Sequence, residues 1–493
     1  MNTQSIGKEK NGLLAGICLL TAALILLICS QCSPLYPINV WVDPNCLLTV
    51  GRAMKEGSVV YRDIYEQKGP TLYLIHYLAA LISDKSFFGV YVMEVLSLAA
   101  SLWAACRMMA GRVKKAWKIP GVLLLAAGLI VSKAFVCGDS AEEFCLPLIL
   151  GTMAIAFHEY GEKKGPMRPK MLFVCGLMAG LTATIKYTLL GAFMGFCLVE
   201  GILALKEGGF VRALRSAGVF LAGMLLPLVL WALYFAANGA LGDFIEVYFY
   251  NNIMIYTEAN VPLSEILAMT KEIIRGNWPW LLLAAGGMLV FLFRRSENLS
   301  LRLCMLAMAA GQFVTVFLFG HVWTYSVMAL GAFAALGILE AGRFASKHVH
   351  LSRKTGIAAL AVFAGVLLLF TWVKTPNRYL RGKKLENIAQ GYLASFMEPG
   401  ASLLQYSHLD DGFYLASGTI PQEKYFVRLN IPLPEMKEEL DRYLEEGIPD
   451  YVVVGWNALP EQFDRYELVE AAMGYREDGR LMKNLFLYRR KAE

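Results

Sequence analysis

The chain has 493 residues, of which 57% are hydrophobic and 17% are charged. A soluble domain carries roughly 25% charged residues, so this composition excludes an ordinary soluble protein and predicts an α-helical polytopic membrane protein. The net charge of +6 comes from short basic blocks between apolar segments. That distribution is typical of cytoplasmic loops and gives no support for nucleic-acid binding.

Apolar length predicts about eleven transmembrane helices, within a range of about eleven to thirteen. They are expected at residues 11–30, 87–108, 119–136, 143–158, 171–185, 187–205, 217–237, 278–293, 303–319, 323–340 and 356–372. The first span follows Lys8 and Lys10 and lacks a clear cleavage site after it, so it is predicted to be a signal anchor.

The distribution of Lys and Arg predicts the orientation of these spans. Lys8 and Lys10 place the N-terminus in the cytoplasm, and the basic stretch 107–118 places the end of the second span there. The later basic blocks fall on the same side, at residues 163–170, 206–215, 294–302 and 343–354. We therefore expect a multi-pass protein of the plasma membrane whose C-terminal domain is extracytoplasmic.

Residues 31–86 form the first extracytoplasmic loop in this topology. The apolar run 70–83 has about fourteen residues, a length that favours a juxtamembrane helix over a span. If it crossed the membrane, the basic stretch 107–118 would lie outside. A second short helix is predicted at residues 45–56, with Pro44 in its first turn and Asp43 as its N-cap.

The composition becomes that of a soluble protein after about residue 375. An amphipathic helix is predicted at residues 436–446 and strands at 451–456 and 485–490. Helices that alternate with strands indicate a small α/β domain. We therefore divide the chain into a transmembrane domain, 1–375, and an extracytoplasmic α/β domain, 376–493.

Three of the ten cysteines, Cys32, Cys46 and Cys137, fall near the outer membrane face. A disulfide between two of them is conceivable if that face is oxidising, but spacing alone cannot show a bridge. Free thiols are the favoured interpretation.

The first outer loop carries the first candidate site residues. Asp43 could act as a general base on an acceptor hydroxyl at the membrane surface, or it could only cap the helix. Arg62 and Lys68 could bind a phosphate, Arg through its planar fork and Lys as a point charge. The alternative is a set of ordinary surface ion pairs, each of which contributes little to stability.

An acidic turn at residues 137–143 is a candidate cation site. Asp139 with Glu142 or Glu143 could hold a divalent cation, Mg or Mn, through carboxylate oxygens. The alternative is helix capping by Asp139 or Ser140, with acids favoured in the first turn of the following helix.

Three further residues stand in or beside apolar segments. Lys186 lies between two apolar runs, where an ionisable group is costly, and suits a phosphate headgroup unless it only extends to the interface. Glu94 lies inside a span and should have a partner from the loop above it. His321 lies at the outer end of a span and could bind a headgroup, or could be one polar residue in a turn.

These features, in this order, resemble the GT-C membrane glycosyltransferases. The branch is that of the protein mannosyltransferases, aminoarabinose transferases and lipopolysaccharide sugar transferases, a family 39-like group. The resemblance rests on an acidic residue after the first span, an amphipathic helix and the run at residues 57–73, GSVVYRDIYEQKGPTLY. That run is similar to the family pattern G-x-x-x-Y-x-D…K-[PG]-P-x-x-Y. The acidic turn, the Lys186 segment and the outer C-terminal domain also fit.

The resemblance implies a GT-C fold and transfer, with inversion, of a sugar from a polyprenyl-phosphate-linked donor to an acceptor at the outer face. It makes Asp43 the catalytic base. Donor phosphate contacts carry over to Lys68, Lys186, Arg62 and His321. Tyr61, Asp63, Tyr65 and Glu94 are expected to support them. Pro44 replaces the second acid that usually follows the catalytic Asp, a departure that argues against protein-mannosyltransferase specificity, and Gly69 replaces the first Pro of the usual Lys-Pro-Pro.

The expected partners are the donor, membrane lipids and an acceptor that is a lipid, a cell-envelope glycan or a protein. Alternatives are a lipid-linked glycan ligase or polymerase, a transporter or flippase with an outer domain, and a non-catalytic protein that binds a cell-wall polymer. Transporters commonly show two related halves with broken helices at the middle of the membrane. This sequence shows no such repeat, and its polar residues gather at one face.

Overall fold

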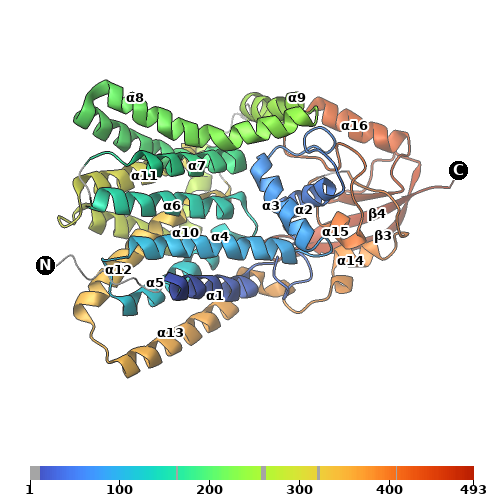
Figure 1. Ribbon diagram of the computed structural model, residues 1–493. Helices are drawn as coiled ribbons and strands as arrows, with labels where there is room; N and C mark the ends of the chain where they lie inside the picture. Colours follow the sequence, from blue (N-terminus) through green and yellow to red (C-terminus); the bar gives the residue numbers. More distant parts are fainter. Residues whose placement is uncertain (1–10, 163–164, 257–261, 319–322, 407, 493) are drawn as a thin grey trace.

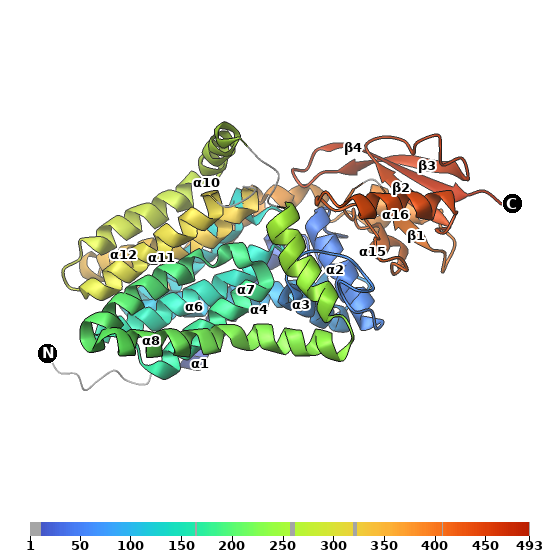
Figure 2. The same cartoon turned by 90° about the horizontal axis from the view of Figure 1, so that it is seen from above.

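The computed structural model describes residues 11–162, 165–256, 262–318, 323–406 and 408–492. It consists of a bundle of long helices with a smaller, sheet-containing domain at one end (Figure 1). The N-terminal helix begins at the end of the bundle that lies away from this domain. Two short helices of the first loop lie between the bundle and the domain, as Figures 1 and 2 show.

Eight helical segments in the described residues are long and apolar enough to cross a membrane. The bundle helices are α1 (Asn11–Cys29), α4 (Phe88–Met108), α5 (Lys115–Ile130), α6 (Ala141–Glu162), α7 (Pro169–Lys186), α8 (Gly191–Ala237), α10 (Leu263–Leu292), α11 (Leu299–Leu318), α12 (Ala334–His348) and α13 (Arg353–Lys374). A buried 3₁₀ segment, Thr324–Phe333, leads into α12. Each predicted span overlaps one of these segments, so the predicted multi-pass helical fold is confirmed.

Two predicted spans fall on the single long helix α8. Its backbone leaves helical geometry at Gly208 and Gly209, and Gly209 has a φ of +67°. Glycine adopts this left-handed conformation without steric cost. Figure 1 shows that the chain turns back at this point, which gives α8 two arms that run in opposite directions.

The basic loops gather at one end of the bundle. Arg112, after α4, donates to Glu297, between α10 and α11, with an Nε–Oε1 distance of 2.9 Å. Arg343 of α12 bonds to the same carboxylate, and Arg294 bonds to Glu340 of α12. This end lies opposite the sheet-containing domain. The predicted grouping of these loops is therefore present, and the compartment that they face stays a prediction.

The first loop forms α2 (Val42–Lys55) and α3 (Pro70–Ile82), which lie across the end of the bundle (Figure 2). The predicted helix at 70–83 is therefore present. The predicted capping of α2 is wrong: Trp41 is its N-cap residue, and Asp43 lies within its first turn. Residues 44–53 of α2 are all buried, because the C-terminal domain covers the side that the bundle leaves open.

The C-terminal domain contains a four-stranded sheet of order β1-β2-β4-β3. Strands β1 (Leu403–Gln405) and β2 (Tyr451–Gly455) are parallel, and β3 (Tyr466–Tyr475) and β4 (Leu481–Arg490) complete it in antiparallel fashion. The short helices α14 (Ala389–Ala394) and α15 (Phe413–Ser417) and the longer α16 (Pro434–Glu445) pack around the sheet. The predicted helix and the two predicted strands are present.

Sequence reasoning missed β1 and β3. Strand β1 is only three residues long, and most side chains of β3 are exposed or half-buried, so neither shows a clear alternation of apolar and polar residues. The cysteine prediction agrees with the structure, since Cys32, Cys46 and Cys137 are all buried free thiols.

Candidate functional site

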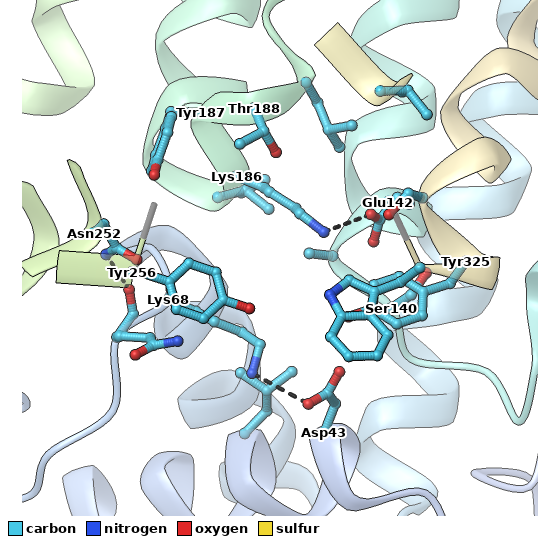
Figure 3. A pocket seen from close by; sticks show the side chains of 18 of the residues that line it. Asp43, Lys68, Ser140, Glu142, Lys186, Tyr187, Thr188, Asn252, Tyr256 and Tyr325 are labelled. Carbon is cyan, nitrogen blue, oxygen red and sulfur yellow. Dashed lines mark hydrogen bonds and ion pairs between the residues drawn. The ribbon is translucent and has the colours of Figure 1, made fainter. Parts of the chain in front are cut away.

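A cavity of about 460 Å³ opens at the end of the bundle beneath α2. Its wall combines α2, the turn before α6, the end of α7, the segment that follows α9 (Leu241–Phe244) and the 3₁₀ segment before α12. The polar lining residues are Asp43, Gln67, Lys68, Asp139, Ser140, Glu142, Lys186, Tyr187, Thr188, Asn252, Tyr256, Thr315, Tyr325 and Ser326. Figure 3 shows the side chains of Asp43, Lys68 and Lys186 converging on this space.

Lys68 joins two carboxylates at one side of the cavity. Its Nζ lies 3.5 Å from Oδ1 of Asp43 and 3.1 Å from Oε1 of Glu66. Glu66 is buried and also accepts a hydrogen bond from the hydroxyl of Tyr73 on α3. Burial by itself would lower the pKa of Lys68, but the charges of Asp43 and Glu66 outweigh it and raise the pKa. Lys68 is therefore a fixed positive charge beside Asp43.

Tyr61 holds the backbone that carries Lys68. Its hydroxyl donates to the Lys68 carbonyl at 2.6 Å, and its buried ring packs against Tyr73 and Phe235. Tyr61 has a φ of +76°, which is strained for a bulky side chain. Such strain persists only where the surroundings fix the conformation. Tyr61 therefore sets the path of the chain at Lys68, and its predicted supporting role toward the donor stays a prediction.

Lys186 stands on the opposite side of the cavity, at the end of α7. Its Nζ lies 2.6 Å from Oε1 of Glu142 and 4.9 Å from the ring centroid of Tyr325. Glu142 is fully buried, and its second oxygen has no hydrogen-bond partner among the described residues. The lysine is thus held by one ion pair and one cation–π contact, with its ammonium group at the cavity wall.

The acidic turn before α6 does not form the predicted cation site. Ser140 and Glu143 make a capping box, in which each side chain accepts a hydrogen bond from the other residue's backbone N–H. Glu142 pairs with Lys186, and Asp139 faces His76 instead. Among the described residues, no group of three or more His, Cys, Asp or Glu side chains is arranged to hold a metal ion. In this structure the carboxylates of Asp139, Glu142 and Glu143 therefore turn to three different partners and do not converge on one point.

His76 and Asp139 form a fully buried pair behind the cavity wall. The Nε2 atom of His76 lies 3.0 Å from both carboxylate oxygens of Asp139, and its Nδ1 lies 2.8 Å from the Leu72 carbonyl. Burial raises the pKa of Asp139, and the neighbouring His76 opposes that effect. The pair links α3 to the turn that supplies Asp139 and Ser140 to the cavity.

Glu94 of α4 has partners, as sequence reasoning expected, but they come from the residue after α1 and from the turn before α6 and not from the first loop. It accepts hydrogen bonds from the hydroxyl of Ser30, at 2.7 Å, and from the backbone N–H of Asp139, at 3.0 Å. Glu94 lies behind the turn and is not among the cavity-lining residues. Glu94 therefore stabilises the conformation of the turn and does not itself contact the cavity.

The predicted site residues Arg62, Asp63 and Tyr65 also lie away from the cavity. Arg62 pairs with Asp63 at an Nε–Oδ1 distance of 2.7 Å and donates to the Asn238 carbonyl, with both ionic side chains largely exposed. Tyr65 accepts a hydrogen bond from Asn251. Arg62 therefore does not reach the phosphate position expected for it, because its guanidinium is used between the first loop and the end of α8. His321 lies outside the described residues.

A second cavity, of about 580 Å³, lies between the first loop and the C-terminal domain. It shares part of its wall with the first cavity, including Trp41, Asp43, Lys68 and Tyr325. Residues of the C-terminal domain form its other wall, namely Leu409, Leu429, Asn430, Glu477 and Asp478. Asp43 thus stands where two cavities meet.

Sequence reasoning missed several residues that line or shape these cavities. Glu66 stands two positions before Lys68 and could have been named from the charge pattern of the loop. Tyr256 and Tyr325 follow apolar runs, where aromatic residues are ordinary at a membrane interface. Glu477 and Asp478 lie on the hairpin between β3 and β4, which the sequence assigned to a separate domain.

The fold is similar to that of two crystal structures of ArnT, an aminoarabinose transferase, from Cupriavidus metallidurans. One is described as bound to undecaprenyl phosphate and the other as the apo state; their TM-scores are 0.59 and 0.60, at 14% and 12% identity. Each comparison covers 97% of this chain and 97% of ArnT. At these identities the likeness shows the fold alone.

A weaker likeness, with a TM-score of 0.46 and 11% identity, relates 90% of this chain to 69% of the archaeal oligosaccharyltransferase AglB from Archaeoglobus fulgidus. No family model and no curated protein matches the sequence.

Proposed function

Because this chain has the fold of the GT-C membrane glycosyltransferases, we propose that it is a glycosyltransferase. It takes a sugar from a polyprenyl-phosphate-linked donor and transfers it, with inversion, to an acceptor hydroxyl at the outer face of the plasma membrane. The observation that carries this proposal is the position of Asp43, a carboxylate at the junction of two cavities with Lys68 at 3.5 Å.

The first cavity suits the donor. Lys68 and Lys186 place two positive charges in its wall, and Ile185, Leu189 and Val316 add apolar surface on the bundle side. A polyprenyl phosphate has one anionic group and a long apolar chain, so it requires both kinds of surface. Each lysine now pairs with a carboxylate, and the donor phosphate would share these ammonium groups.

The second cavity suits the acceptor, because it reaches Asp43 from the side of the C-terminal domain. Asp43 takes the proton of the acceptor hydroxyl as that oxygen bonds to the anomeric carbon of the sugar. The bond from the anomeric carbon to the phosphate oxygen breaks, and its electron pair leaves with the phosphate. Lys68 and Lys186 stabilise the negative charge that grows on the leaving group. Entry from the face opposite the phosphate gives inversion.

The test is transfer of a radiolabelled sugar from a polyprenyl phosphate to cell-envelope acceptors by the full-length protein in proteoliposomes. Replacing Asp43 by Asn removes the base and should lower the rate by roughly a hundredfold or more. Asp84→Asn is the matched control, because Asp84 belongs to the same loop but pairs with Lys55 at the exposed end of α3. Transfer by Asp43→Asn at the control rate would remove Asp43 from the role of base.

A further inference from the structure

A cluster of basic residues begins at the last residue of α13, at the end of the molecule that carries the C-terminal domain. It comprises Lys374, Arg378, Arg381, Lys383 and Lys384. The basic loops described above lie at the opposite end, so this cluster departs from the usual concentration of Lys and Arg on one side of a membrane protein. A local binding partner for these basic side chains would explain why they lie at this end.

The segment that carries the cluster is fixed to the bundle. The side chain of Asn377 donates to the Cys29 carbonyl at the end of α1, at 2.7 Å, and to the Val136 carbonyl, at 3.0 Å. The backbone N–H of Gly382 donates to the Leu35 carbonyl at 3.3 Å. The basic residues are therefore held beside residues 34–37, which follow α1.

A groove of about 540 Å³ lies between these two segments. Its lining combines apolar and basic side chains: Pro34, Leu35, Tyr36, Pro37, Trp372, Arg381, Lys383, Lys384 and Leu385, with Gly382. Helix α13 leads to it, and most of its apolar side chains are exposed, as expected for a helix that faces lipid. The groove thus opens at the membrane interface, where Trp372 is half exposed.

Two of the basic residues stabilise the end of α13, whereas Lys384 has a different partner. Arg378 and Arg381 donate to the carbonyls of Val373 and Trp372, which caps the end of α13. Arg381 also stacks on the Trp372 ring at 3.6 Å, and its buried Nε has no hydrogen-bond partner among the described residues. Lys384 is exposed, and among the described residues its ion-pair partner is Glu386, also exposed, at 3.5 Å.

We propose that this groove binds the phosphate headgroup of an anionic phospholipid from the leaflet on the side of the C-terminal domain. The ammonium group of Lys384 would face the phosphate, joined by that of Lys383 when it leaves the hydroxyl of Tyr475, and the nearby guanidinium of Arg381 would add its positive charge. Trp372, Leu35 and Leu385 would contact the glycerol and the first part of the acyl chains. Clusters of Lys and Arg next to a transmembrane helix attract anionic lipid in this way. The site is separate from both cavities at Asp43 and does not depend on the proposed transfer reaction.

The test uses the full-length protein in phosphatidylcholine nanodiscs that contain a photoactivatable phosphatidylglycerol, with labelled peptides identified by mass spectrometry. We expect label at residues 34–37 and 372–385, displaced by unlabelled phosphatidylglycerol but not by inorganic phosphate. In the double variant Lys383→Gln/Lys384→Gln, the phosphatidylglycerol needed for half-maximal labelling should rise by about 25-fold, since each of the two basic residues near an anionic surface contributes about fivefold.

The matched control is Lys347→Gln/Lys354→Gln, which removes two exposed lysines from the opposite end of the bundle. Labelling of the groove should be unchanged in this control. Because Lys383 also donates to the hydroxyl of Tyr475, the single variant Lys384→Gln provides a second test in which that contact is intact. Equal labelling by a photoactivatable phosphatidylcholine, displacement by inorganic phosphate, or an unchanged response in both groove variants would overturn the proposal.

Discussion

Thr49 and Asp410 are 361 positions apart in the sequence, yet the hydroxyl of Thr49 donates to the carboxylate of Asp410 at 2.7 Å. Thr49 lies on α2, the helix that carries Asp43. Asp410 lies in the loop after β1 of the C-terminal domain. Three residues further along α2, Arg52 donates to the backbone carbonyls of Tyr414 and Gly418. The helix of the proposed base is therefore held from the side of the C-terminal domain.

The environment of Asp410 predicts a pH dependence of stability. Burial raises its pKa to about 6, although the Thr49 hydroxyl, the Gly412 N–H and the charge of Arg52 oppose the shift. A carboxyl whose pKa is higher in the folded protein stabilises the fold below the unfolded pKa of about 4, and this contribution is lost as pH rises through 6. The difference amounts to about 3 kcal/mol in the free energy of unfolding.

Asp410→Asn should remove this dependence, because an amide can still accept from Gly412 and donate to Thr49. The variant should gain stability over the native protein between pH 4 and pH 7, as measured by thermal unfolding of both proteins in detergent. Asp411, which pairs with Lys483 and His408, is present in both proteins, so the comparison reports the loss of the Asp410 carboxyl together with its charge interaction with Asp411. If the difference in stability between the variant and the native protein were constant from pH 4 to pH 7, the raised pKa of Asp410 would be contradicted.

Replacement of Lys186 should separate its role in the fold from its role toward the donor. Lys186→Met leaves the buried carboxylate of Glu142 without its partner and should cost about 1–3 kcal/mol in stability. The double variant Lys186→Met/Glu142→Gln should recover that stability, because no unpaired charge stays buried. If the ammonium group of Lys186 stabilises the leaving phosphate, the rate of sugar transfer should be on the order of a hundredfold below the native rate in both variants.

Transfer assays at several donor concentrations, combined with thermal unfolding, check this prediction. Recovery of both stability and transfer in the double variant would assign Lys186 a structural role alone.

The contact between α2 and α3 should tolerate no side chain at Gly51. A Cβ atom at this position would lie 2.5 Å from the backbone carbonyl carbon of His76. Gly51→Ala must therefore push the two helices apart, which should cost about 1–3 kcal/mol and should also lower transfer, since α2 carries Asp43. Gly16→Ala in α1 is the matched control, because a Cβ there meets no atom within 4 Å. Thermal unfolding and transfer rates are measured on both variants. A Gly51→Ala protein with native stability and a native transfer rate would contradict the close contact between α2 and α3 at Gly51.

The sequence predicted the membrane class, the positions of the spans and the grouping of the basic loops, because each depends on apolar length or on charge. It also singled out Asp43, Lys68 and Lys186, since charged residues beside apolar runs stand out in a membrane protein. It misplaced Arg62, whose guanidinium is drawn to a neighbouring carboxylate and to the end of α8. Nothing in the local pattern distinguishes such an ion pair from a ligand contact.

Hydrophobic patterning along the chain therefore determined which segments enter the membrane and which residues are unusual there. Only the tertiary structure decided what those residues meet. Asp43 faces two cavities because α2 is held between the bundle and the C-terminal domain, and Asp139 meets His76 because α3 crosses the turn before α6. Contacts between residues far apart in sequence depend on how whole helices pack, which no local periodicity records.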